Sequence, residues 1–350
     1  MDKLKINFYN IDACGYYVKQ KLKFGNLLEI LLDFKDWVNN KNLNETCTFS
    51  TNDDNGDILP VYCFDIVFSN DKRDAILTTW NETETIRSGM ASVNGLDPIG
   101  NPKVETTSVP AGHIPGYPTY FWFSISHGTL ATIRLDNSRL NGHKGLKLLF
   151  NSFLSKFSKY VVVDSAIDES PKDESINAKV LGYQENEEKG ICSKVSPVFR
   201  TSVKRIEGEL EFIRRNCNKI TKILRKDCLH TMESDDIGFL LKLLSNMGLK
   251  RKTIVSNETR IKYELPINNL EEQELNDIIK NWSEDKEKWS DVGFKIDGEP
   301  EPKWLSHSIV KEEIEINADK TEKGILKAES LLNEIIDHKE KLIPLIERQN

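Results

Sequence analysis

The sequence predicts an α+β fold: an antiparallel-sheet N-terminal domain with flanking helices, then a second, smaller α+β domain. Short segments that alternate apolar and polar residues are interleaved with amphipathic segments of helical spacing. The chain has 350 residues, enough for about two domains with separate cores. A polar, acidic segment divides it. We therefore predict an N-terminal domain at 1–167, an acidic connection at 168–196 and a C-terminal domain at 197–350.

The predicted N-terminal domain begins with an alternating strand and an amphipathic helix. Residues 5–10 alternate, and residues 26–39 place leucines and aromatic residues at helical spacing after Asn26, a suitable N-cap. The same patterns, with turn residues between them, predict the remaining elements. These are strands near Thr48 and at 61–68, a short helix at 83–90, a long loop at 94–118, a hairpin at 119–135 with its turn at 126–128, a helix at 145–157 and a strand at 160–164.

An aromatic run lies at the start of that hairpin, and it comprises Tyr117, Tyr120, Phe121, Trp122 and Phe123. Aromatic side chains can stack on the bases of a nucleic acid. A run with aromatic residues on both faces is more typical of a strand that is buried on both sides, and we favour that interpretation.

The most informative segment is 210–228, which we interpret as a single amphipathic helix. At ~100° per residue, Ile213, Cys217 and Ile220 share one side, with Leu224 one turn further on. The opposite side is cationic, with Arg215, Lys219, Lys222 and Lys226. Helices that merely keep a protein soluble usually mix charge signs at i,i+4, so the stripe indicates a phosphate-contacting surface. The alternative is a solvated helix whose lysines pair with acidic residues elsewhere.

More basic residues follow this segment. A helix at 236–246 is expected to end at Gly248, and the cations after it would also stabilise a helix C-terminus. Strands at 253–255 and 259–265 would bring Arg260 and Lys262 to one face. The complete predicted DNA-binding surface is Arg214, Arg215, Lys219, Lys222, Arg225, Lys226, Lys250, Arg251, Lys252, Arg260 and Lys262.

The C-terminal part of the chain is predicted to close the second domain. We expect an acidic helix at 270–282, strands at 292–296 and 306–316, and a final helix at 322–342. Pro344 should end or kink that helix. Its apolar stripe would pack on its own domain or on a twin subunit.

The sequence carries none of the common catalytic motifs. Phosphate-binding loops, dinucleotide-binding glycines, nucleophile elbows and His-Glu-x-x-His are all missing. We therefore expect no catalytic residues and no cofactor, and a protein that is not an enzyme. A metal-dependent nuclease remains an alternative, with carboxylates drawn from Asp65, Glu82, Glu84, Asp164 and Asp168.

Metal sites and disulfides are not expected either. Cys217, Cys228 and His230 would need a distant fourth ligand to complete a zinc site. The acidic turn at 52–57 lacks the glycine position and the closing carboxylate of a calcium loop. The six cysteines are scattered, and no apolar run reaches the ~18 residues of a membrane span. These features, with no secretory signal pattern at the start, predict a cytoplasmic protein with reduced thiols.

Several segments, taken in order, resemble the RexA-like phage exclusion proteins of abortive infection. They are Ile6-Asn7-Phe8-Tyr9, the hairpin GYPTYFWF at 116–123 leading to GTLATIR at 128–134, and a polar strand followed by a lysine-rich amphipathic helix at the end. The resemblance implies a DNA-binding dimer that acts in abortive infection, commonly with a membrane-embedded partner. It supplies no catalytic residue. This chain departs from the pattern by extra segments around 168–189 and 277–301.

The expected function is therefore sequence-nonspecific DNA binding in anti-phage defence, by a homodimer that senses DNA and signals to an effector protein. The formal net charge of −7 is no obstacle, because the basic residues are concentrated in the middle of the chain. A protein-binding regulatory subunit without nucleic-acid contact is the other class that remains open.

Overall fold

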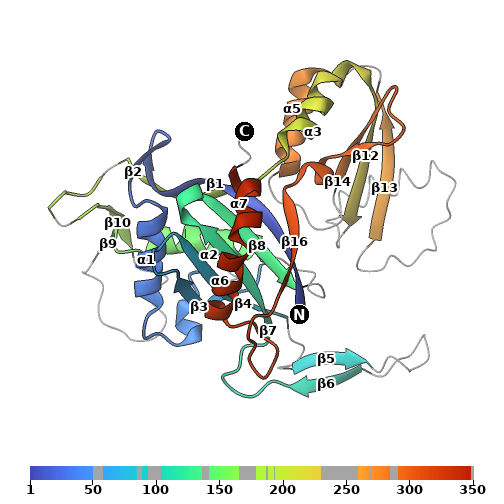
Figure 1. Cartoon of the computed structure of the whole chain (residues 1–350). Coiled ribbons are helices and arrows are strands. Elements are labelled where there is room, and N and C mark those ends of the chain that lie inside the picture. Colours follow the sequence, from blue (N-terminus) through green and yellow to red (C-terminus); the bar gives the residue numbers. More distant parts are fainter. Residues whose placement is uncertain are drawn as a thin grey trace. The chain divides into compact units, whose positions relative to one another are not determined.

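The computed structural model describes residues 1–49, 58–84, 89–93, 104–135, 142–164, 179–186, 188–192, 194–229, 259–267, 270–283 and 291–347. The chain forms two compact units and has the mixed α+β architecture that the sequence predicts (Figure 1). Unit 1 comprises Met1–Ser202 together with Lys311–Gln349, and unit 2 comprises Val203–Val310.

Unit 1 is built on an eight-stranded sheet. Six of its strands follow the order β11-β1-β8-β7-β4-β3, and the other two, β2 and β16, both pair with β1. Its strands are β1 (Asp2–Val18), β2 (Lys21–Phe24), β3 (Val61–Phe68), β4 (Asp74–Glu82), β7 (Gly116–Ser124), β8 (Thr129–Leu135), β11 (Ser196–Val203) and β16 (Lys311–Ile316). Neighbouring strands in sequence, such as β3 with β4 and β7 with β8, are antiparallel.

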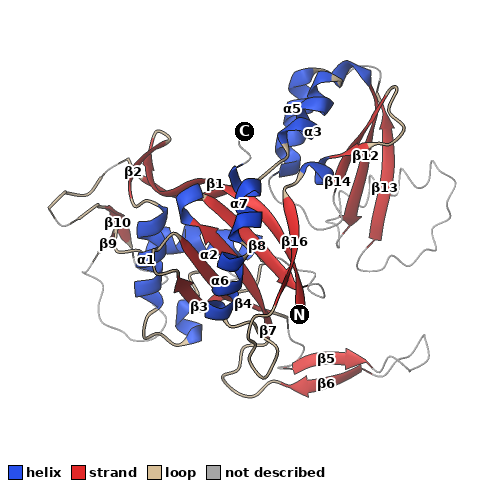
Figure 2. Ribbon diagram, in the orientation of Figure 1, coloured by secondary structure: helices blue, strands red, loops and turns tan. Residues whose placement is uncertain are grey.

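Helices cover both faces of this sheet (Figure 2). On one face, Phe150 of α2 (His143–Lys156) packs against Phe34 of α1 (Leu27–Val38), Phe123 of β7 and Phe199 of β11, with ring centroids 4.9–5.9 Å apart. On the other face, α6 (Ala328–Asp337) packs against β3 and β4. Helix α7 (Lys339–Glu347) contacts α6 and is joined to β4 through Lys339 and Asp74. Tyr120, Phe121, Trp122 and Phe123 of the aromatic run are thus buried, as favoured from the sequence, whereas Tyr117 is half-buried.

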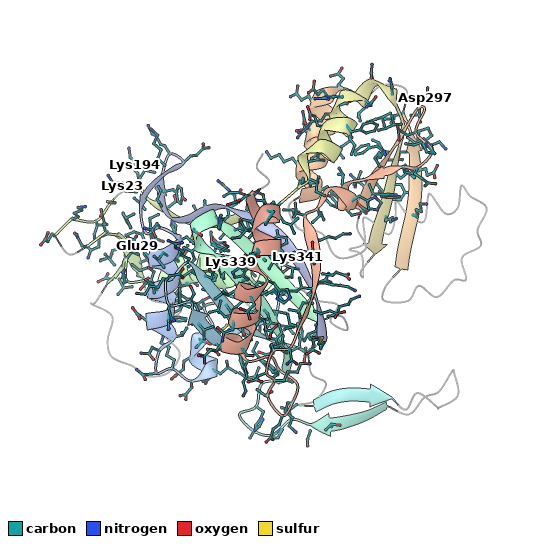
Figure 3. The ribbon with its side chains drawn as sticks, in the orientation of Figure 1. Lys23, Glu29, Lys194, Asp297, Lys339 and Lys341 are labelled. Carbon is teal, nitrogen blue, oxygen red and sulfur yellow. The ribbon has the colours of Figure 1, made fainter. Side chains whose placement is uncertain are left out.

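An ion pair between a partly exposed lysine and a buried carboxylate joins α7 to the sheet. Lys339, labelled in Figure 3, donates from Nζ to Asp74 Oδ2 at 2.6 Å. Trp122 Nε1 donates to Asp74 Oδ1 at 3.0 Å. Asp74 is almost fully buried, so its two carboxylate oxygens depend on these partners in place of water.

Local signals explain several element boundaries. Glu29 N donates to Asn26 Oδ1, and Asn26 N donates to Glu29 Oε2, so the predicted N-cap is part of a capping box. Gly128 ends the turn η2 (Ile125–His127) at φ +56°, which closes the β7–β8 hairpin where predicted. Smaller elements complete the unit: η1 (Leu43–Thr46), the pair β5 (Gly89–Val93) and β6 (Val104–Ser108), and the pair β9 (Val161–Val163) and β10 (Val180–Tyr183).

Unit 2 has a four-stranded antiparallel sheet of order β13-β12-β14-β15. The strands are β12 (Ile220–Leu229), β13 (Thr259–Pro266), β14 (Asp291–Ile296) and β15 (Lys303–Trp304), and the helices are α3 (Glu207–Arg215), η4 (Cys217–Lys219), α5 (Glu272–Ser283) and η5 (Leu305–Ser308). Leu210 and Ile213 of α3 and Leu275, Ile279 and Trp282 of α5 form one core with Ile223, Val292, Phe294 and Ile296 of the sheet.

The predicted helix at 210–228 is wrong beyond Arg215. Helix α3 ends there, Asn216 is its C-cap, and the chain continues through η4 into strand β12. The spacing of Ile213, Cys217 and Ile220 suits a helix, but the β-branched residues of Ile220-Thr221-Lys222-Ile223 favour a strand. Pairing with β13 and β14 on both sides decides the outcome.

The predicted domain boundaries also differ from the observed units. Residues 311–347 belong to unit 1, because β16 pairs with β1 from Asp2↔Ile316 to Asn7↔Lys311. Strand β11 belongs to unit 1 as well, and β10 falls within the predicted acidic connection at 168–196.

Other boundaries need correction too. In place of one final helix at 322–342 there are two: α6 starts at Ala328 and ends before His338, and α7 follows it. Pro344 lies inside α7 and does not end it. Strand β4 was missed, Gly89 and Met90 of the predicted helix at 83–90 lie in β5, and β6 lies in the predicted loop at 94–118. The predicted elements at 52–57, 236–246 and 253–255 fall outside the described residues. Among the residues that are described, no helix has the length and apolar character needed to cross a membrane.

Candidate nucleic-acid interface

The two faces of the unit 2 sheet differ in character. One face carries Ile223, Val292, Phe294 and Ile296 and packs on α3 and α5. Side chains two residues apart on a strand point to the same face, so the alternate residues point the other way. Lys222 lies opposite Lys295, and Lys226 lies opposite Lys262. We call the surface formed by Lys222, Lys226, Lys262, Lys295 and Trp304 the lysine face.

Trp304 lies at the centre of the lysine face. It pairs with Gly293, and a Cβ on Gly293 would come within 2.8 Å of the indole ring, so the ring lies directly on the glycine backbone. Lys226 Nζ is 3.8 Å from the centroid of the Trp304 ring, and Lys262 Nζ is 6.0 Å from it. The indole therefore holds two ammonium groups over its ring by cation–π attraction.

Two acidic residues lie among these lysines. Lys222 Nζ donates to Glu264 Oε2 at 3.0 Å, and the pKa of Glu264 is lowered by this hydrogen bond, by the charge of Lys222 and then by that of Lys262. Asp291, opposite Lys226, is buried and accepts from Ser306 N and Ser306 Oγ. Lys295 Nζ donates to the carbonyl oxygens of Glu299 and Pro300. Among the described residues of this face, four lysines stand against two carboxylates, which is a formal surplus of positive charge.

The surface predicted from the sequence is divided between different parts of unit 2. Lys222, Lys226 and Lys262 are brought together on the lysine face. Arg225 alternates with Lys226 and lies on the other side of β12. Arg214 and Arg215 belong to α3, where Arg214 Nε donates to Asn276 Oδ1 at 3.2 Å and Arg215 forms an ion pair with Glu211. Lys219 is exposed in η4.

For the other residues of the predicted DNA-binding surface, the structure describes no side-chain position. Arg260 pairs with Cys228 at the end of β13, and only its backbone register is described. Lys250, Arg251 and Lys252 lie outside the described residues.

Two members of the lysine face were missed in the sequence. Lys295 and Trp304 come from β14 and β15, about 70 residues after β12, and neither belongs to a basic cluster. The alternation Gly293-Phe294-Lys295-Ile296 does indicate that Lys295 points away from the core, but only the register tells which lysines it joins.

The alternative metal sites are not assembled in the part of the chain that the structure describes. No group of three or more His, Cys, Asp or Glu side chains is placed there to hold a metal ion. Cys217 is buried and its thiol donates to the carbonyl of Leu270, while His230 is outside the described residues. Of the nuclease carboxylates, Glu82 accepts from the Tyr62 hydroxyl at 2.8 Å, and Asp168 is not described.

Comparison of the chain with protein-family models, with curated proteins and with solved structures finds no match.

Proposed function

We propose that unit 2 binds the phosphate backbone of nucleic acid, and of DNA in particular, through the lysine face and without sequence preference. The observation that supports this is the strand register, which gathers Lys222, Lys226, Lys262 and Lys295 from three strands onto the side of the sheet opposite the helices. Lysines contact phosphates as point charges and carry no base information, so affinity would come from charge neutralisation.

A pair of matched variants tests the location of the interface. Lys222→Glu/Lys262→Glu reverses two exposed charges on the lysine face, and Arg214→Glu/Arg215→Glu makes the same change in charge on α3. We expect the first variant to bind a duplex of arbitrary sequence at least about tenfold more weakly in a gel-shift titration, since each reversal removes a phosphate contact and adds repulsion. The second should bind within about threefold of the wild type.

The same titration distinguishes the alternatives. Equal losses in both variants would mean that the protein's overall charge, and not the lysine face, governs binding. Failure of the wild-type protein to bind at low salt would overturn the proposal and favour the protein-binding class. Cleavage of the DNA in magnesium would favour the nuclease.

We further propose that DNA binding serves phage exclusion by a homodimer that signals to an effector protein, as the sequence resemblance implies. Cells that express the protein should reduce phage plating, and Lys222→Glu/Lys262→Glu should restore it while Arg214→Glu/Arg215→Glu does not. If cells that express Lys222→Glu/Lys262→Glu were still fully protected from phage, phage exclusion would not depend on DNA binding by the lysine face.

A further inference from the structure

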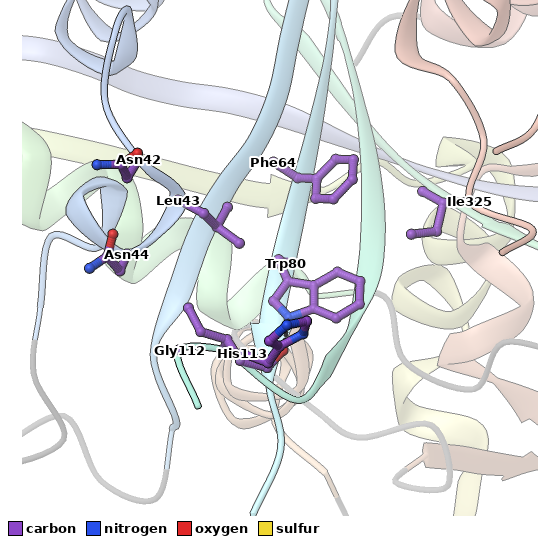
Figure 4. Close-up of a pocket in the computed structure, with 9 residues that line it drawn as sticks. Asn42, Leu43, Asn44, Phe64, Trp80, Gly112, His113 and Ile325 are labelled. Carbon is purple, nitrogen blue, oxygen red and sulfur yellow. Dashed lines mark hydrogen bonds between the residues drawn. The ribbon is translucent and has the colours of Figure 1, made fainter. Parts of the chain in front are cut away.

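Unit 1 contains a pocket of about 480 Å³ that lies outside the lysine face (Figure 4). Five parts of the chain line it: residues 42–44 at the start of η1, Phe64 of β3, Trp80 of β4, the loop at 112–114, and Ile325 before α6. Pockets for small molecules typically measure ~300–1,000 Å³, so the volume suits a ligand the size of a nucleobase with its sugar.

An aromatic pair forms the centre of the pocket. Phe64 of β3 and Trp80 of β4 stack with ring centroids 6.0 Å apart and an angle of 28° between their planes. Trp80 Nε1 donates to the carbonyl of Ile114 at 3.0 Å, which fixes the indole. A Cβ at Gly116 would lie 2.8 Å from Trp80 Nε1 and 2.1 Å from the Asn81 carbonyl oxygen, so only glycine lets the chain approach so closely.

Phe64 reaches the pocket because of a β-bulge. The β3–β4 register shifts between Cys63 and Asp65, so Phe64 is the extra residue on β3. A bulge re-aims one side chain of a strand and recurs beside functional sites. Here it leaves Phe64 41% exposed, while Cys63 and Ile66 are buried. A large aromatic side chain is thus held at the surface by backbone geometry and stacked on a fixed tryptophan.

The lining selects against charged ligands. Its apolar members are Leu43, Ile114 and Ile325, which lie around the aromatic pair, and its polar members are Asn42, Asn44 and His113. Among the described residues that line the pocket, none is Asp, Glu, Lys or Arg. A phosphate or carboxylate would find no countercharge here, whereas a neutral ring would find stacking surface and the imidazole of His113 beside Trp80 (Figure 4).

We propose that this pocket binds a nucleobase-like ring, neutral and planar, which stacks on Phe64. Stacking on a pre-positioned aromatic side chain is how proteins hold bases irrespective of sequence. The ring can come from a free nucleoside or from an unpaired base in a single strand. The site uses no residue of the lysine face, so the proposal does not depend on the proposed function of unit 2.

The test measures binding of adenosine, guanosine, cytidine and thymidine, and of a short single-stranded DNA, to the full-length protein by calorimetry. Phe64→Ala should weaken binding about tenfold or more, because one base–aromatic stack is removed. Phe68→Leu is the matched control on the same strand, since Phe68 lies outside the pocket with Lys35 Nζ over its ring at 5.3 Å. It should bind like the wild type.

The two arms identify the source of the ring. Nucleoside binding that is lost in Phe64→Ala and kept in Phe68→Leu supports the proposal with a free ligand. If only the oligonucleotide binds, the test is repeated in the Lys222→Glu/Lys262→Glu variant. Oligonucleotide binding that remains in this variant and is lost when Phe64→Ala is added supports an unpaired base in the pocket. No binding of nucleoside or oligonucleotide at millimolar concentration, or equal binding by Phe64→Ala and wild type, would overturn the proposal.

Discussion

The sheets of the two units are covered differently. In β7 of unit 1, Tyr120, Phe121, Trp122 and Phe123 are all buried, because helices lie on both faces. In β12 of unit 2, Ile223 is buried in the core with α3 and α5, whereas Lys222 on the other face is exposed. On that other face Leu224 is buried, opposite the Gly293 that pairs with Trp304. A strand that is covered on both sides uses all its side chains for packing, whereas a strand covered on one side can present charged side chains to solvent on the other. This difference locates the candidate interface in unit 2.

The largest effect that tests this comparison is expected in the core of unit 1. Phe150→Ala removes a ring that contacts Phe34, Phe123 and Phe199, and should lower the free energy of unfolding by about 3–5 kcal/mol. Phe64→Ala, at a half-exposed site, should cost about 1 kcal/mol or less. Urea denaturation followed by circular dichroism measures both, and similar losses would contradict the assigned burial.

The attachment of α7 to the sheet of unit 1 is tested through Lys339. Lys339→Met leaves the buried carboxylate of Asp74 with Trp122 Nε1 as its remaining hydrogen-bond donor among the described contacts. We expect a loss of about 2–3 kcal/mol, below that of a fully buried pair because Lys339 is partly exposed. The control is Lys341→Met on the same helix. Its lysine is exposed and its partner Glu312 is half-buried, so this pair should be worth less than about 1 kcal/mol. Equal effects would mean that α7 is not fastened by Asp74.

Unit 2 is tested at the contact between Gly293 and Trp304. Gly293→Ala places a methyl group 2.8 Å from the indole ring, so the ring must shift and about 1–2 kcal/mol should be lost. Gly298→Ala serves as a control for the space beside the backbone, since a Cβ there meets nothing within 4 Å, although its φ of +85° adds strain of its own. A change in Trp304 fluorescence in Gly293→Ala alone would confirm the contact. An unchanged spectrum would argue against it.

The smallest expected effect concerns Glu264, the exposed one of the two acidic residues described on the lysine face. Glu264→Gln removes a negative charge that pairs with Lys222, so DNA affinity at low salt should rise about two- to fivefold. Glu211→Gln, which frees Arg215 on α3, should leave affinity unchanged. Fluorescence anisotropy resolves this difference, and tighter binding by Glu211→Gln would move the interface to α3.

Sequence patterns predicted the parts of the fold with local signals. The capping box at Asn26, strand β3 and the hairpin closed by Gly128 are examples. The segment after Arg215 was misassigned because its apolar spacing fits a helix as well as a helix followed by a strand. Only pairing with β13 and β14, which are distant in sequence, distinguishes the two.

Long-range contacts account for the other errors. No local feature indicates that β16 pairs with β1, more than 300 residues earlier, so the closing segment was assigned to the wrong unit. The candidate site was predicted in part, because Lys222, Lys226 and Lys262 were named. Lys262 was assigned to the correct strand, whereas Lys222 and Lys226 were assigned to a helix where the structure has β12. Lys295 and Trp304 join them through strand register alone.

The most direct test of the central claim is the salt dependence of DNA binding by the wild type and by Lys222→Glu/Lys262→Glu. The slope of log Kobs against log salt concentration reports the number of phosphates neutralised, at about 0.9 per contact on duplex DNA. If the lysine face is the interface, the slope for Lys222→Glu/Lys262→Glu should be about 2 units shallower than the slope for the wild type. An unchanged slope would show that these lysines do not contact phosphates.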